Sequence, residues 1–220
     1  GSGIVIDGNL YLFYTGNVKD DDGNRESYQC LAVSEDGEHF ERWEPSIVNQ
    51  PDGYTRHIRD PKIWEKDGKY YAVLGIQSEK LEGKVVLYSS ENIKDWKFEG
   101  EIAGANHGKL LKDFGFMWEC PDYFEVDGKE IFMFSPQGIT RMYPYYENMY
   151  QIGYSVVEDG IENVDKLDNF TLLDYGHDFY ASQTFLDEDN NRILIGWMYV
   201  PDSSYINPTT KFGYQNCLTV

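Results

Sequence analysis

The fold is decided by the stretch Asp67–Leu74, which reads Asp-Gly-Lys-Tyr-Tyr-Ala-Val-Leu. An Asp-Gly pair before an apolar, aromatic-rich run is a strong signal for a tight β-hairpin, because both residues tolerate the positive φ that the turn requires. The signal occurs four times, with Asn-Asn after the aspartate in the last copy, at intervals of 60, 60 and 62 residues. The turn residues are Asp7, Asp67, Asp127 and Asp189. This spacing predicts a structural repeat of about 60 residues.

Each repeat also contains a second hairpin signal. In the first repeat, Tyr28–Ser34 leads through Glu35-Asp36-Gly37 to Phe40 and Trp43. Four strands per unit, repeated along the chain, are typical of the blades of a β-propeller, in which each small sheet packs only on its neighbours. A β-sandwich, the alternative all-β fold, has no reason to show this period. Because no stretch has the apolar spacing of an amphipathic helix, we expect few helices.

The 220 residues hold fewer than four such units, whereas propellers close with roughly four to eight blades. We therefore expect residues 1–220 to form one partial propeller domain belonging to a longer protein. An incomplete ring exposes a sheet edge, which invites self-association between chains.

Composition restricts the possible partners. There are 19 Lys and Arg residues against 38 Asp and Glu residues, and the net charge of −19 disfavours binding to nucleic acid or to an anionic membrane. No apolar run approaches the length of a membrane helix. Aromatic residues make up 16% of the chain. Their faces pack on sugars, and carboxylates accept hydroxyl protons, so this composition suits a neutral carbohydrate.

Cysteine and histidine usage predicts no metal site and no cofactor. Cys30, Cys120 and Cys217 are widely spaced, and the four histidines are equally scattered, so no cluster with zinc-ligand spacing exists. Reduced thiols favour a cytoplasmic protein. Secretion is the alternative, because a segment before Gly1 could carry a signal peptide.

Two carboxylates stand out at similar places in successive repeats. Asp60 precedes the turn residue of its repeat by 7 residues, and Glu119 precedes the next by 8. The first strands of propeller blades lie close to the central axis, so these side chains point into one funnel. Two converging carboxylates are what a glycosidase needs. The alternative is that an acidic residue near proline is a turn or strand-end residue, and that neighbouring aromatic residues such as Trp118 only form core.

The motifs Arg59-Asp60-Pro61 and Trp118-Glu119-Cys120-Pro121-Asp122 resemble two signature motifs of glycoside hydrolase family 32, the β-fructosidases. The resemblance covers the whole chain in the family's motif order. Further matching stretches are Phe13–Asn17, Asp178–Phe185 and Gly196–Met198.

This resemblance implies a five-bladed β-propeller, of which the chain covers roughly blades two to five, without the first blade and without the β-sandwich that usually follows. It implies retaining hydrolysis of β-D-fructofuranosides, with Glu119 as acid/base and Asp60 as transition-state stabiliser. Arg59 is expected to orient Asp60 and bind substrate, and Cys120 to tune the acidity of Glu119. The sugar pocket is expected to be shaped by Tyr180, Gln183 and Trp197.

The sequence departs from the family in one respect. The nucleophile motif Trp-Met-Asn-Asp-Pro-Asn-Gly is absent from the 220 residues, and Asp7 is a turn residue expected to face solvent. We therefore expect the 220 residues alone to be inactive and the parent protein to be active.

Two other functions stay open at this point, a non-catalytic fructoside-binding propeller and an arabinanase-like propeller glycosidase. The substrate is also open between sucrose, sucrose 6-phosphate and fructan. A phosphorylated substrate needs a basic pocket, to which four arginines could contribute. They are Arg25, Arg56, Arg59 and Arg141.

Overall fold

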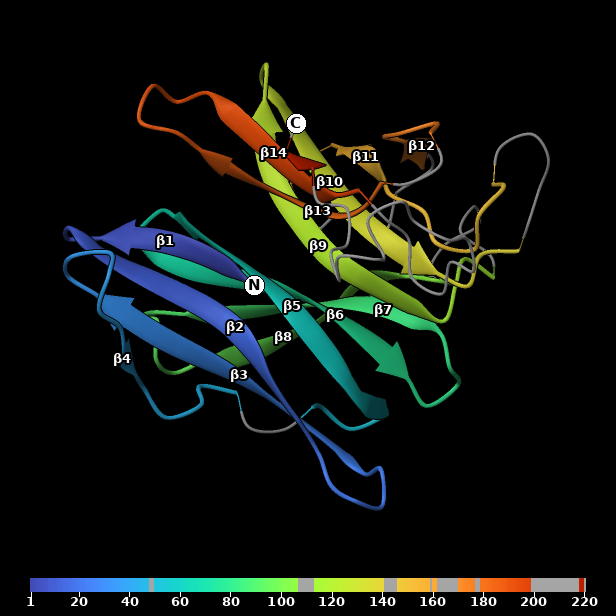
Figure 1. Ribbon diagram of the computed structural model, residues 1–220, viewed down its shortest axis with the longest axis horizontal. Helices are drawn as coiled ribbons and strands as arrows, with labels where there is room; N and C mark the ends of the chain where they lie inside the picture. The colour runs from blue at the N-terminus through green and yellow to red at the C-terminus, as the bar shows by residue number, and fades with distance from the viewer. Residues whose placement is uncertain are drawn as a thin grey trace, which may run out of the picture.

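The computed structural model describes residues 1–47, 50–106, 113–140, 146–158, 160–161, 170–176, 179–198 and 218–219. These residues form four antiparallel sheets that follow one another along the chain, which confirms the all-β prediction (Figure 1). No described residue lies in an α-helix, and thus none lies in a helix able to span a membrane.

In each sheet, neighbouring strands are consecutive in the sequence. The first sheet contains β1 (Ser2–Ile6), β2 (Asn9–Lys19), β3 (Arg25–Ser34) and β4 (Glu41–Arg42). The second contains β5 (Tyr54–Lys66), β6 (Lys69–Ser78), β7 (Gly83–Ser90) and β8 (Lys97–Gly104). The third contains β9 (Met117–Val126), β10 (Lys129–Gln137), β11 (Gly153–Val157) and β12 (Thr171–Leu172). The fourth contains β13 (Tyr180–Leu186), β14 (Arg192–Trp197) and β15 (Leu218–Thr219).

Three of the four predicted turns have the expected geometry. Asp7, Asp67 and Asp127 have φ of 50°, 54° and 51°, and the glycine after each also has a positive φ, as a type I′ hairpin requires. Asp7 is exposed, as expected. The fourth turn is wider than predicted, because β13 ends at Leu186 and β14 begins only at Arg192.

The first strands of the second, third and fourth sheets each contain a β-bulge. Regular pairing breaks between Arg59 and Lys62 in β5 and between Tyr180 and Gln183 in β13. In β9 it breaks between Glu119 and Asp122, which pair with Ser135 and Met133 of β10. In each bulge one non-glycine residue has a positive φ: 60° at Asp60, 47° at Cys120 and 54° at Ala181.

The bulges correct the sequence alignment of the two carboxylates. Asp60 is structurally equivalent to Cys120, and not to Glu119. The residue equivalent to Glu119 is Arg59. Arg59 pairs with Gly75 on β6, and Glu119 pairs with Ser135, which holds the same position on β10. In the fourth sheet, Tyr180 occupies the position equivalent to Arg59 and Glu119.

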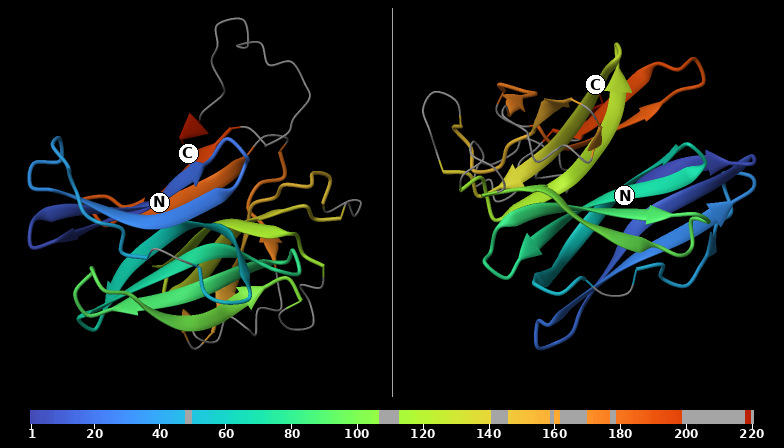
Figure 2. Two further views of the ribbon diagram at one scale, coloured as in Figure 1. Left: turned by 90° about the horizontal axis from the view of Figure 1, so that it is seen from below. Right: turned by 180° about the vertical axis from the view of Figure 1, so that it is seen from behind.

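Figure 2 shows the sheets in two further views. The apolar core lies between successive sheets. One apolar cluster joins the first and second sheets around Phe13, Ile58 and Leu74, and another joins the second and third around Trp118 and Phe134. The two rings of the second cluster stack with centroids 4.0 Å apart. The expected self-association through sheet edges stays a prediction.

The first strands of all four sheets are joined by polar contacts at one repeat position. The hydroxyl of Ser2 donates to Pro61 O (2.8 Å) and accepts from Ile63 N (2.9 Å). Lys62 Nζ lies 2.9 Å from Asp122 Oδ1 and donates to Thr184 O at 2.6 Å. The amide of Thr184 donates to Asp122 Oδ2 at 2.6 Å. We call Ser2, Lys62, Asp122 and Thr184 the inner polar row.

We predict that Lys62→Met lowers the free energy of unfolding of the full-length protein by about 3–5 kcal/mol, because it leaves the fully buried carboxylate of Asp122 without its cation. Urea unfolding measures this change. The control Lys129→Met alters an exposed lysine and should change stability by no more than about 0.5 kcal/mol. A loss below about 1 kcal/mol for Lys62→Met contradicts the stabilising role of the ion pair.

Candidate active site

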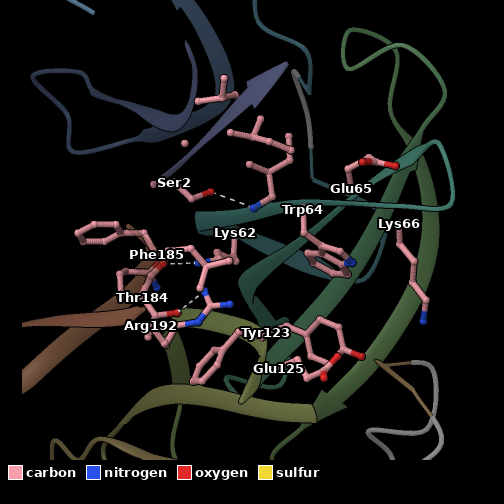
Figure 3. A pocket seen from close by; sticks show the side chains of 18 of the residues that line it. Ser2, Lys62, Trp64, Glu65, Lys66, Tyr123, Glu125, Thr184, Phe185 and Arg192 are labelled. Carbon is pink, nitrogen blue, oxygen red and sulfur yellow. Dashed lines mark hydrogen bonds between the residues drawn. The ribbon is translucent and has the colours of Figure 1, made fainter. Parts of the chain in front are cut away.

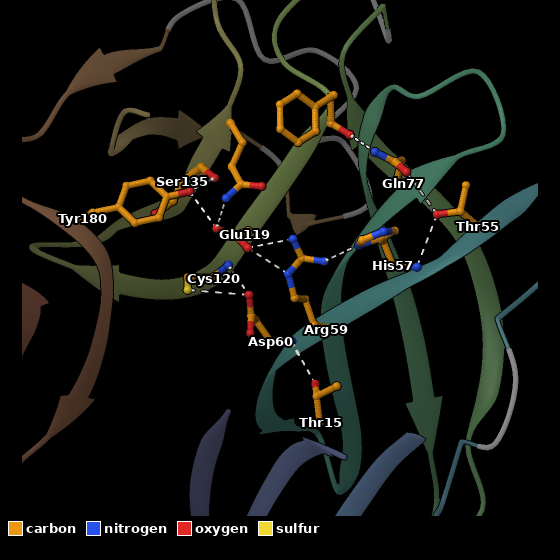
Figure 4. Close-up of polar contacts among 12 residues, drawn as sticks. Thr15, Thr55, His57, Arg59, Asp60, Gln77, Glu119, Cys120, Ser135 and Tyr180 are labelled. Atoms are coloured by element: carbon orange, nitrogen blue, oxygen red, sulfur yellow. Dashed lines mark hydrogen bonds and ion pairs between the residues drawn. The ribbon is translucent and has the colours of Figure 1, made fainter. Parts of the chain in front are cut away.

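The carboxylate of Glu119 receives hydrogen bonds at both oxygens (Figure 4). Arg59 approaches Oε1 with Nε at 2.8 Å and Nη2 at 2.7 Å. Oε2 accepts from Gln137 Nε2 and from the hydroxyl of Tyr180, both at 2.7 Å. The Glu119 side chain is 17% exposed and that of Arg59 is 20% exposed. Residues from three sheets thus hold one largely buried, charge-paired carboxylate.

Asp60 lies beside Glu119 and is fixed independently of it. Its Oδ2 accepts hydrogen bonds from the amide of Cys120 at 3.0 Å and from the Cys120 thiol at 3.6 Å. Its own amide donates to Thr15 Oγ1 at 3.1 Å, and the Thr15 hydroxyl donates to Gln29 at 2.8 Å. Strands β2 and β9 therefore hold Asp60 from opposite sides.

The Cys120 thiol is a neutral hydrogen-bond donor in this arrangement. Burial raises its pKa well above the usual range, and the negative charges of Asp60 and Glu119 raise the pKa further. A thiol in such surroundings is a poor nucleophile, because only the thiolate is reactive. Cys30 and Cys120 are both free cysteines, whereas Cys217 lies outside the described residues.

Two of the three predicted pocket residues on the fourth sheet join this cluster. Burial raises the pKa of Tyr180 well above its usual range, and the charge of Glu119 adds to the effect, so the phenol remains a donor. Gln183 Nε2 donates to Cys120 O at 3.0 Å and holds the bulge of β9 against β13. Trp197 lies opposite Tyr180 in the β13–β14 ladder. A role for Trp197 in the sugar pocket stays a prediction.

The structure corrects the expected role of Arg59. We expected its guanidinium to orient Asp60, but it binds Glu119, because Arg59 and Glu119 occupy equivalent positions on neighbouring strands. Sequence reasoning also missed Thr15, Gln137 and His57. The repeat offered one signal for Gln137, because Gln77 lies 60 residues before it. In the structure both glutamines make side-chain hydrogen bonds.

A cavity of about 940 Å³ lies at the other ends of the same strands (Figure 3). It is lined by the segment 1–5, by residues that follow the bulges, among them Lys62, Tyr123 and Thr184, and by Arg192 on β14. Neither Glu119 nor Asp60 lines it. The converging carboxylates, and not this cavity, therefore define the candidate active site. Among the described residues, no group of His, Cys, Asp and Glu could hold a metal ion.

The profile of the "Glycosyl hydrolases family 32 N-terminal domain" matches residues 1–220. This chain belongs to glycosyl hydrolase family 32. The family assignment confirms the resemblance and excludes the arabinanase-like alternative. The chain is 48% identical to a sucrose-6-phosphate hydrolase of Bacillus subtilis (strain 168), over 100% of this chain and 46% of that protein. It is 44% identical to the enzyme of the same name from Staphylococcus xylosus, over 100% and 44%.

Solved structures agree with this family 32 assignment. The fold matches that of a mutant Bombyx mori GH32 beta-fructofuranosidase in complex with sucrose, with a TM-score of 0.85 and 38% identity over 99% of this chain and 46% of that chain. It also matches sucrose-6-phosphate hydrolase from Lactobacillus gasseri, with a TM-score of 0.84 and 33% identity over 98% and 44%. The chain thus spans about half the length of the relatives that it matches.

We predict that Cys120 resists alkylation in the native family 32 protein. At pH 8.5 its raised pKa leaves little thiolate, so iodoacetamide should label it at least about tenfold more slowly than in the unfolded chain. Peptide mass spectrometry measures both rates on the same cysteine, with the guanidinium-unfolded protein as the control. Native labelling within twofold of the unfolded rate contradicts the neutral, buried thiol.

Proposed function

We propose that the full-length protein hydrolyses β-D-fructofuranosides, such as sucrose or sucrose 6-phosphate, with retention at the anomeric carbon. One observation carries this proposal: in a chain of family 32, Glu119 and Asp60 lie side by side on neighbouring strands, each held by its own hydrogen bonds. We further propose that the four sheets are blades two to five of a five-bladed propeller. The four-stranded units and their stacking support this.

Glu119 acts as the acid/base. It protonates the glycosidic oxygen as the bond to the leaving group breaks, and it later takes a proton from the water that attacks the fructosyl group. Arg59 and Tyr180 fix the direction of the carboxyl group. Correct placement matters because a general acid must lie within hydrogen-bond reach of the oxygen that it protonates.

Asp60 stabilises the positive charge that develops on the fructosyl ring. Hydrogen bonds from Cys120 engage its Oδ2. Within the described part of the chain, no group donates to Oδ1, so this oxygen is available for fructosyl hydroxyls. A carboxylate fixed in advance stabilises a cationic transition state without reorganisation during the reaction.

Retention also requires a nucleophilic carboxylate about 5–5.5 Å from the acid/base. The 220 residues do not contain the family's nucleophile motif, so the proposal is made for the full-length protein. Inactivity of the 220 residues on their own stays a prediction.

We predict that Glu119→Gln lowers kcat for fructose release by the full-length protein about a hundredfold or more, because the amide cannot donate or accept the proton. Chromatographic measurement of fructose released from sucrose and sucrose 6-phosphate tests this. Glu125→Gln, at an exposed position on the same strand, is the matched control and should retain activity. If the wild-type protein binds these sugars but releases no fructose, a non-catalytic binding protein replaces the proposed hydrolase.

We predict that Tyr180→Phe lowers kcat/KM about tenfold, because it removes one neutral hydrogen-bond donor from Glu119 but leaves Arg59 and Gln137 in place. Steady-state kinetics on sucrose measure the change. Tyr154→Phe, on β11, is the comparison variant and should leave kcat/KM within twofold of wild type. Equal activity of both variants means that the Tyr180 hydroxyl does not support Glu119.

A further inference from the structure

The sequence suggested four arginines for a basic pocket, and the structure gives one of them a direct contact with the acid/base. Arg59 contacts Glu119, whereas Arg56 lies 3.9 Å from Glu26 and Arg141 lies outside the described residues. Binding of a phosphate group by these arginines stays a prediction. The contribution of Arg59 depends on what holds its guanidinium in place.

The guanidinium of Arg59 is held on two sides. Its Nε and Nη2 lie 2.8 Å and 2.7 Å from Glu119 Oε1. Its remaining nitrogen, Nη1, lies 3.3 Å from Nδ1 of His57 (Figure 4). The Arg59 side chain therefore bridges His57 and the carboxylate of Glu119.

His57 is a neutral hydrogen-bond acceptor in this contact. A guanidinium can only donate, so Nδ1 accepts and the imidazole carries its proton on Nε2. Burial lowers the pKa of His57, and the positive charges of Arg25, Arg59 and Lys19 lower it further. The imidazole therefore keeps the lone pair that receives the Arg59 hydrogen bond.

A threonine hydroxyl fixes the backbone of His57 where the strand pairing is irregular. The β5–β6 ladder is interrupted between Tyr54 and Ile58. Inside this interval, the amide of His57 donates to Thr55 Oγ1 at 3.2 Å. The Thr55 hydroxyl in turn donates to Gln77 Oε1, also at 3.2 Å. The hydroxyl thus gives this amide an acceptor and ties it to β6.

Two glutamines close this chain of contacts into a ring. Gln77 is buried, and its Nε2 donates to Phe116 O at 2.9 Å. The amide of Phe116 donates to Gln137 O at 2.8 Å. Gln137 Nε2 then donates to Glu119 Oε2 at 2.7 Å. The contacts that begin at one oxygen of the carboxylate therefore return to it at the other oxygen.

We propose that His57 is a positioning residue for the acid/base: it holds Arg59 in the orientation that directs Glu119 at the glycosidic oxygen. This inference rests on the proposed function. A guanidinium released from His57 can turn toward another carboxylate, and Asp60 is its neighbour in the chain. Misplacement of a reacting group by about 1 Å can lower the rate about a hundredfold, so the acceptor on His57 matters for proton transfer although it does not touch the substrate.

The test compares two kinds of substrate that differ in their need for a proton. A disaccharide (sucrose or sucrose 6-phosphate, whichever the wild type cleaves faster) depends on general acid catalysis, because its leaving group is a poor one. β-D-Fructofuranosyl fluoride releases fluoride, which leaves without protonation by an acid. Misplacement of Glu119 should therefore lower kcat/KM for the disaccharide and not for the fluoride. The Glu119→Gln variant is the reference for this pattern.

In the full-length protein, His57→Leu should lower kcat/KM for the disaccharide about tenfold and leave the value for the fluoride within about threefold of wild type. His57→Asn supplies an acceptor close to the place of Nδ1, and should restore the disaccharide value to within about threefold. Thr55→Val keeps the shape but removes the hydroxyl, and should give the same selective loss at about threefold. The control His39→Leu alters a histidine whose side chain is 85% exposed and should change neither value.

The outcomes separate the two proposals. Equal losses on both substrates in His57→Leu, or no loss on either, refute the positioning role. Thermal unfolding shows whether His57→Leu folds. If it does not fold, Thr55→Val decides, and a loss that is not selective for the disaccharide refutes the role. No fructose from any substrate in the wild type refutes the proposed hydrolase itself.

Discussion

The arrangement of the active site depends on the inner polar row. Its members Ser2, Lys62, Asp122 and Thr184 are 60, 60 and 62 residues apart, the same intervals as the hairpin turns. The row joins the first strand of every sheet to the next one. The bulges lie only a few residues before it, so the ion pair that holds the strands together also fixes how far Glu119 lies from its donors. A buried pair gives little net stability but is costly to break, which makes it suitable for setting this register.

Carboxylates on the surface and carboxylates near the inner strands lie in different surroundings. The excess of carboxylates lies mainly on exposed strands and turns, where solvent screens them. Near the inner strands, carboxylates have fixed partners: Arg59 holds Glu119, Lys62 holds Asp122, and the Cys120 amide holds Asp60. The carboxylates of Glu119 and Asp60 are therefore oriented before a substrate binds, and that of Asp122 holds neighbouring strands together.

The repeat made the fold predictable, whereas the bulges limited prediction of the site. Asp-Gly turns encode a local conformation, so the hairpins at Asp7, Asp67 and Asp127 could be predicted from two residues each. A bulge arises from strand pairing between distant segments, and it shifts the side-chain register by one residue. For this reason the sequence identified Glu119 but paired Arg59 with the wrong carboxylate. Contacts such as the one between Gln137 and Glu119 depend on that register and were missed.

The bulges also explain why non-glycine residues accept a strained backbone. A positive φ costs an ordinary residue about 1–2 kcal/mol, and glycine would avoid that cost. At Asp60 and Cys120, however, the side chain is needed, because the carboxylate of one accepts hydrogen bonds from the amide and thiol of the other. At Ala181 no such partner is needed, and the smallest side chain with a Cβ occupies the position. The strain at Asp60 and at Cys120 thus lies where two bulges face each other, and the hydrogen bonds between these two residues offset it.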